Sequence, residues 1–181
     1  FLDLKIHDIP NTAAQAVRAL TGLGADLMTL HGSGGSAMLK AAAVAAADEA
    51  RRLSVISPKL LAVTVLTSID ADEWKKLGHT NSISQSVLTM AGAAKAAGMD
   101  GTVSSPHEAA EIRRLNGPDF LIVTPGIRPS FAQSDDQKRI TTPKEAVQNG
   151  ATHLVVGRPI TKAADPQEAG HSGRNQGGIR C

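Results

Sequence analysis

Three charged side chains, Asp3, Lys5 and Asp8, stand within six residues at the start of the chain. Residues two apart on a strand point to the same side, so Asp3 and Lys5 would share one face, with Asp8 in the next loop. Carboxylates on both sides offset the cost of burying a lysine. Such an array can deliver a proton to a carbanion-like centre while an aspartate repels a substrate carboxylate. The alternative is a structural ion pair, but three charges beside an apolar strand are costly without a function.

A second set of residues has the chemistry of a phosphate site. Gly157 and Arg158, followed by a proline, come directly after the apolar run 152–156. Backbone N–H groups at a helix start and a bidentate arginine bind oxyanions. Arg128, in the loop after the run 120–124, is a candidate second contact. The alternative is a tight turn with a surface arginine.

Other polar residues also follow predicted strands. Thr67 and Ser68 end the run 59–66 and are candidates to hydrogen-bond a polar ring or to cap the next helix. The long polar loop 125–139 contains Gln137 and is a candidate lid, with a plain solvated loop as the alternative. His31 also ends a strand, where a structural role is more common than a functional one.

The elements that must position these residues follow from one recurring pattern. Amphipathic stretches end at glycines, and short apolar runs follow. The predicted strands are 1–5, 27–30, 59–66, 102–103, 120–124 and 152–156. The predicted helices are 12–23, 36–52, 82–97, 106–115 and 143–149. Alternation of strand and helix predicts a parallel sheet and an α/β fold.

Two architectures contain such units, an open doubly wound sheet and a (β/α)8 TIM barrel. Candidate functional residues stand at the ends of at least four strands, which favours a barrel, because its strand ends all meet at one mouth. Barrel phosphate sites commonly use the loops after strands 7 and 8. If residues 152–156 form strand 8, residues 1–5 form strand 3. We therefore expect an incomplete barrel, with strands 3 to 8 present and two units missing before Phe1.

Composition excludes several classes of protein. The only cysteine is Cys181, so there is no disulfide framework. A net charge of +2, four aromatic residues and no basic block give little basis for nucleic-acid binding. No apolar run has the roughly 18 residues of a membrane span. We expect a cytoplasmic protein with one partial barrel domain, residues 1–169, and a glycine-rich segment, residues 170–181, that is disordered or foreign.

Taken together, the motifs resemble the orotidine 5′-phosphate decarboxylase family of the bacterial type. The resemblance covers residues 1 to about 169 and lies in the segments 1–12, 63–68, 123–129, 136–143 and 155–161. The D-x-K-x-x-D pattern alone also occurs in related sugar-phosphate decarboxylases. Its combination with Pro-Gly-Ile-Arg at 125–128 and Asp-Gln-x-Arg-Ile at 136–140 is far more specific.

The resemblance implies decarboxylation of orotidine 5′-phosphate to uridine 5′-phosphate in pyrimidine synthesis, with no cofactor or metal. The implied catalytic residues are Lys5, the proton donor to C6 of the pyrimidine, Asp3, which crowds the substrate carboxylate, and Asp8. A homodimer with shared active sites is also implied. The residues reaching the neighbouring site would be Asp8, Ile9 and Thr12. Those lining the pyrimidine would be Thr67 and Pro125, and those holding the phosphate would be Arg128, Gln137, Gly157 and Arg158.

The family also uses an aspartate on strand 1 and a lysine on strand 2, and neither strand is present in this chain. Two alternatives therefore stay open. One is a catalytically incompetent barrel fragment, whose strands 3 and 8 would have unpaired edges. The other is a Mg-dependent sugar-phosphate decarboxylase of the same suprafamily, against which the Gln137 region and Thr67 argue.

Overall fold

The structure, a computed structural model, describes residues 1–128 and 141–177. Strand and helix alternate along most of the chain. The strands are β1 (Leu2–Ile6), β2 (Leu27–His31), β3 (Lys59–Val63), β4 (Gly101–Val103), β5 (Leu121–Thr124) and β6 (His153–Leu154). The helices are α1 (Pro10–Thr21), α2 (Gly35–Leu53), α3 (Ala71–Lys76), α4 (Ile83–Ala96), α5 (Ala109–Asn116), α6 (Pro143–Gln148), α7 (Arg158–Thr161) and α8 (Pro166–Gly177). A 3-10 turn, Gly32–Gly34, precedes α2.

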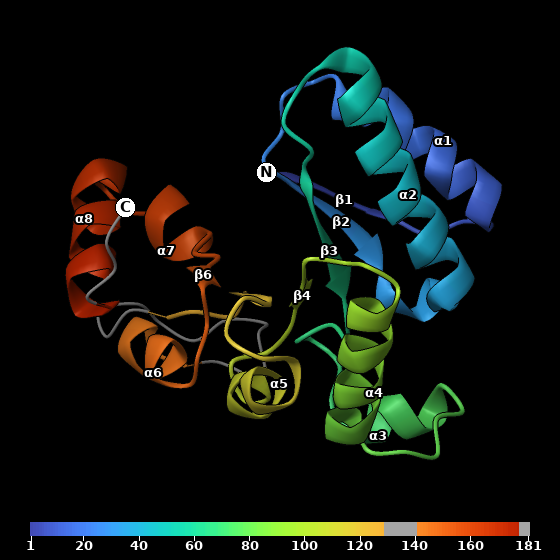
Figure 1. The fold of residues 1–181 in the computed structure, drawn as a ribbon. Coiled ribbons are helices and arrows are strands. Elements are labelled where there is room, and N and C mark those ends of the chain that lie inside the picture. Colours follow the sequence, from blue (N-terminus) through green and yellow to red (C-terminus); the bar gives the residue numbers. More distant parts are fainter. Residues whose placement is uncertain (129–140, 178–181) are drawn as a thin grey trace.

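The six strands form one parallel sheet in sequence order, from β1 to β6. Each crossover contains at least one helix, as a parallel connection requires. Figure 1 shows α1 and α2 beside β1 and β2, with α4 and α5 further along the sheet. This order, without reversal, is the one expected of successive units of a barrel rather than of a doubly wound sheet.

Successive residues of a strand point to opposite faces of the sheet, and those on one face pack against the helices. Met28 pairs with Leu60 and Leu30 with Ala62, and all four are buried in one cluster with side chains of α1, α2 and α4. A second cluster joins α4 and α5 to β5 through residues that include Val87, Ala91, Ile112 and Ile122. Helix α4 therefore contributes to both clusters, and α1, α2, α4 and α5 pack against one face of the sheet.

Local signals in the sequence explain several element ends. Ser82 and Gln85 form a reciprocal capping box at the start of α4, and Thr142 and Glu145 form another at α6. The Glu145 carboxylate accepts hydrogen bonds from the Thr142 backbone and from the Thr142 and Thr141 hydroxyls, which lower its pKa to about 2. These boxes satisfy backbone N–H groups that have no partner inside the helix.

Several predicted ranges differ from the structure. Helix α5 begins at Ala109 rather than at 106, because Ser105 accepts from the His107 backbone N–H and closes a turn there instead of capping a helix. Strand β6 has only two residues. We expected residues 170–181 to be disordered or foreign, and the structure has α8 running to Gly177 and packing against α6 and α7. Tertiary packing can outweigh the low helix propensity of its glycines.

Candidate active site

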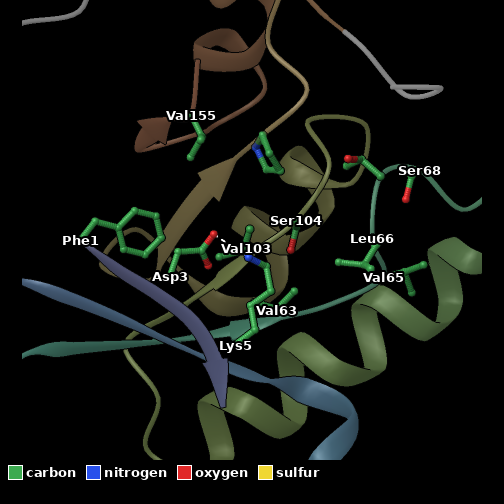
Figure 2. Close-up of a pocket in the computed structure, with 12 residues that line it drawn as sticks. Phe1, Asp3, Lys5, Val63, Val65, Leu66, Ser68, Val103, Ser104 and Val155 are labelled. Carbon is green, nitrogen blue, oxygen red and sulfur yellow. Dashed lines mark hydrogen bonds and ion pairs between the residues drawn. The ribbon is translucent and has the colours of Figure 1, made fainter. Parts of the chain in front are cut away.

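A pocket lies where the strands end. It is lined by Phe1, Asp3, Lys5, Val63, Val65, Leu66, Thr67, Ser68, Val103, Ser104, Pro125 and Val155. These residues come from β1 and from the ends of β3, β4, β5 and β6, so one pocket collects side chains from most of the sheet. Figure 2 shows Asp3 and Lys5 extending from β1 toward it. The carboxyl ends of barrel strands are where active sites of this fold are built.

Asp3 and Lys5 form the charged centre of the pocket. Lys5 Nζ lies 2.6 Å from Asp3 Oδ2, and both side chains line the cavity, as their spacing predicted. The buried Thr29 on β2 also binds both residues. Its hydroxyl donates to Asp3 Oδ1 and accepts from the Lys5 backbone N–H, each at 2.9 Å. The pair is therefore connected to the neighbouring strand as well as to itself.

Within one chain, the arrangement differs in two respects from a buried lysine between two carboxylates. The side chains of Lys5 and Asp3 are 38% and 45% exposed, because β1 is the edge strand of the described sheet. Asp8 does not join them among the described residues. Its carboxylate instead accepts the backbone N–H of Ile9 at 2.7 Å, where α1 begins. Asp8, Ile9 and Thr12 are all exposed and stand outside the pocket lining.

Thr67 and Pro125 both line the pocket, and Thr67 is buried. The alternative role of Thr67 and Ser68 as helix caps is wrong, because Asp70 caps α3 by accepting the Glu73 backbone N–H. This leaves the Thr67 side chain at the cavity wall.

The arginines predicted for phosphate binding are not among the residues that line the pocket, and each follows a lining residue by three positions. Arg128 is 9% exposed, and its guanidinium donates to the Ile127 carbonyl at 3.0 Å. It lies three residues beyond Pro125. Arg158 opens α7 with Gly157 at the N-cap position, as predicted. Its strand-end neighbour Val155 lines the pocket. Gln137 and most of the expected lid, residues 125–139, lie outside the described residues.

Sequence reasoning missed two polar residues at the site, Thr29 and Ser104. Thr29 sits inside an apolar strand, where a threonine has no distinguishing signal. Ser104 is buried, lines the pocket and accepts a hydrogen bond from the Thr64 hydroxyl at 3.3 Å. Its position directly after the β4 residues was the available signal, but the Ser-Ser-Pro pattern favoured a helix cap.

His31 is the titratable neighbour of the charged pair. Its ring centroid lies 5.2 Å from that of His7, with the rings tilted by 43°. Partial burial, then the positive charges that His7 and Lys5 can carry, lower the pKa of His31, while Asp3 acts in the opposite direction. The neutral form of His31 is therefore favoured beside Lys5.

The described residues, 1–128 and 141–177, contain no group of three or more His, Cys, Asp or Glu side chains placed to hold a metal ion. They also contain no helix of the length and apolar composition that crossing a membrane requires.

The fold and pocket together define a barrel-type α/β protein with a charged active-site pocket at its strand ends. Residues 1–172 match the model of the orotidine 5′-phosphate decarboxylase / HUMPS family. Orotidine 5′-phosphate decarboxylase of Trichlorobacter lovleyi is 54% identical over 169 residues, covering 93% of this chain and 69% of the relative. The enzyme of that name from Moorella thermoacetica is 49% identical over 170 residues, covering 93% and 68%.

A solved structure agrees with these sequence matches. The crystal structure of orotidine 5′-phosphate decarboxylase from Lactobacillus acidophilus superposes with a TM-score of 0.85 at 40% identity, covering 99% of this chain and 75% of that one. The chain therefore belongs to the orotidine 5′-phosphate decarboxylase / HUMPS family. The predicted family and the predicted TIM-barrel relationship are confirmed.

Proposed function

We propose that this chain decarboxylates orotidine 5′-phosphate to uridine 5′-phosphate, with Lys5 as the proton donor. The observation that carries the proposal is the Asp3–Lys5 ion pair, 2.6 Å long, facing a pocket at the strand ends of a chain in this family. The relatives quoted above are themselves named for this substrate. A lysine and an aspartate side by side supply the two charges that the reaction uses.

The reaction needs one bond broken and one formed at the same carbon. The C6–carboxylate bond breaks, CO2 leaves, and the electron pair stays on C6 of the pyrimidine. Lys5 Nζ then gives a proton to C6, which forms the C–H bond of the product. Asp3 beside the substrate carboxylate repels it, and this repulsion is relieved as CO2 departs. Fixed charges that match the transition state better than the substrate accelerate the chemical step.

The remaining pocket residues bind the rest of the substrate in this proposal. Thr67 and Pro125 contact the pyrimidine, whereas the phosphate is held from the loops that follow β5 and β6. The residues of that phosphate site are Arg128, Gln137, Gly157 and Arg158. No metal or cofactor takes part in this proposal, because Lys5 supplies the proton and the fixed charges of Lys5 and Asp3 supply the electrostatic stabilisation.

We also propose a homodimer in which the start of α1 completes the neighbouring site. Asp8, Ile9 and Thr12 are exposed there, and Ile9 as a whole residue is 67% exposed. These exposed side chains are free to contact a partner subunit, which is what a shared active site requires. Light scattering that finds only a monomer across concentrations contradicts this part of the proposal.

The first test follows the orotate absorbance after the substrate is added to the purified chain. We expect the absorbance to fall, and Lys5→Ala to lower kcat by about 10²–10⁴-fold, the usual contribution of a positioned general acid. Lys40→Ala removes an exposed lysine on α2 and is the matched control, with unchanged turnover. Wild-type turnover that Lys5→Ala leaves intact rules out the proposed role of Lys5.

Two other outcomes would favour the alternatives. Turnover of a sugar phosphate that stops on adding a chelator favours the Mg-dependent decarboxylase. A chain that melts broadly and never turns over orotidine 5′-phosphate favours the incompetent fragment, for which the free edges of β1 and β6 in the described sheet are the motivating observation.

A further inference from the structure

One buried hydroxyl joins the two charged residues of the pocket. Thr29 on β2 is 0% exposed, and its hydroxyl donates to Asp3 Oδ1 at 2.9 Å. The same oxygen accepts the backbone N–H of Lys5, also at 2.9 Å. A threonine hydroxyl has one proton to donate and can accept as well, so Thr29 uses both capacities on this pair.

The bond to Lys5 falls where β1 departs from regular pairing. Leu2 pairs with Met28 and Ile6 with Leu30, so the register shifts between these two points. Lys5 lies within that irregular segment and has a φ of +54°, in the left-handed region that residues other than glycine rarely adopt. Irregular segments of this kind re-aim side chains next to active sites. The Thr29 hydroxyl takes the place of a backbone acceptor for Lys5 there.

The bond to Asp3 fixes the other half of the pair. Asp3 Oδ1 accepts from Thr29, while Asp3 Oδ2 accepts from Lys5 Nζ. Both carboxylate oxygens of Asp3 thus accept a hydrogen bond, one from Thr29 and one from Lys5, which fixes the orientation of the carboxylate. Figure 2 shows the Asp3 and Lys5 side chains directed at each other inside the pocket. Thr29 does not line the pocket itself.

We propose that Thr29 is a positioning residue that sets the geometry of the Asp3–Lys5 pair for decarboxylation. The proposal rests on the proposed function. Thr29 acts on the carboxylate through Oδ1 and on the lysine through its backbone, so one side chain controls where both charges stand. Displacing a reacting group by about 1 Å can cost on the order of 10²-fold in rate.

The test replaces Thr29 by valine, which has nearly the same shape and no hydroxyl. We expect Thr29→Val to lower kcat by about 10–100-fold with KM little changed, and Thr29→Ser, which keeps the hydroxyl, to restore most of it. Thr102→Val is the matched control. Thr102 is also 0% exposed, on β4, and its hydroxyl has no hydrogen-bond partner among the described residues. This control should retain wild-type turnover.

A second readout does not depend on turnover. Amide hydrogen exchange by NMR should show a protected Lys5 N–H in the wild type and a much faster one in Thr29→Val, with the amides of α2 unchanged. A Lys5 amide that exchanges freely in the wild type overturns the proposal even if Thr29→Val does not fold. Equal loss of kcat in Thr29→Val and Thr102→Val also overturns it. Absent wild-type turnover refutes the proposed function, while the exchange data still decide whether Thr29 holds Lys5.

Discussion

At the scale of single residues, the pocket is defined by a few contacts between neighbouring strands. The Asp3–Lys5 pair is half-exposed, so solvent screens its attraction and it adds little to folding stability. Its persistence is better explained by orientation, because Thr29 holds one member by its side chain and the other by its backbone. The same neighbourhood contains His31, whose protonation would add a positive charge beside Lys5.

His31 should therefore make the folded state sensitive to acid. Its pKa in the folded state lies below the ordinary value of 6.5, so the unfolded state binds more protons between the two values. Stability should fall as pH drops from about 6.5 through the lowered pKa, and the effect is small because His31 is partly exposed.

Urea unfolding at pH 7.5 and pH 5.5 measures this effect. His31→Gln should show a smaller loss of stability between the two pH values than the wild type does. His107→Gln, which replaces an exposed histidine, gives the background change. A pH dependence that is identical in the wild type and His31→Gln would show that His31 is not responsible.

At the scale of elements, the strands are short and their spacing depends on small residues. Gly101 begins β4 and pairs with Leu121 of β5. A Cβ at Gly101 would collide with the backbone carbonyl oxygen and the Cβ of Leu121. The carbonyl belongs to the adjacent strand, so it cannot move without disturbing the ladder. A glycine in a strand often marks such a close approach of another chain segment.

We expect Gly101→Ala to lower the free energy of unfolding by about 1–3 kcal/mol, as overpacking does. Chemical denaturation measures the loss. Gly92→Ala, on α4, is the control, because a Cβ there meets nothing within 4 Å and alanine favours a helix. An unchanged stability in Gly101→Ala would mean that β4 and β5 are further apart than described.

At the scale of the whole molecule, two buried clusters support the sheet. Leu39 of α2 belongs to the cluster under β1 to β3, and Ile112 of α5 belongs to the one beside β5. Both side chains are fully buried. The clusters share α4 but no side chain, so the pocket residues of β1 and of β5 depend on different parts of the core.

Leu39→Ala and Ile112→Ala should each lower the free energy of unfolding by about 2–5 kcal/mol, the usual cost of such a cavity. The double variant should lose the sum to within about 0.5 kcal/mol, because separate sites act independently. Denaturant titration of the three variants and the wild type checks this. A double variant that falls well short of the sum would show that the two clusters are coupled.

Much of the fold could be predicted from the sequence because its signals are local. The runs at 27–30 and 120–124 are buried strands, and the predicted ranges lie within one residue of β2 and β5. The alternation of apolar runs with helices that end at glycines predicted the parallel sheet. The resemblance to the family also assigned Asp3, Lys5, Thr67 and Pro125 to one site, and all four line the same pocket in the structure.

What only the tertiary structure decided concerns contacts between residues far apart in the chain. Asp8 was expected to reach a neighbouring site, and within this chain its carboxylate accepts the Ile9 backbone N–H at 2.7 Å, a contact that the spacing of charges does not specify. Thr29 has no sequence signal, since a threonine in an apolar strand is ordinary, and its role exists only where β2 lies against the irregular part of β1. The sequence thus determined most of the elements, the family and the charged residues Asp3 and Lys5. Only the register between β1 and β2 decided that the Thr29 hydroxyl holds this pair, because hydrogen bonds depend on distances that spacing along the chain does not specify.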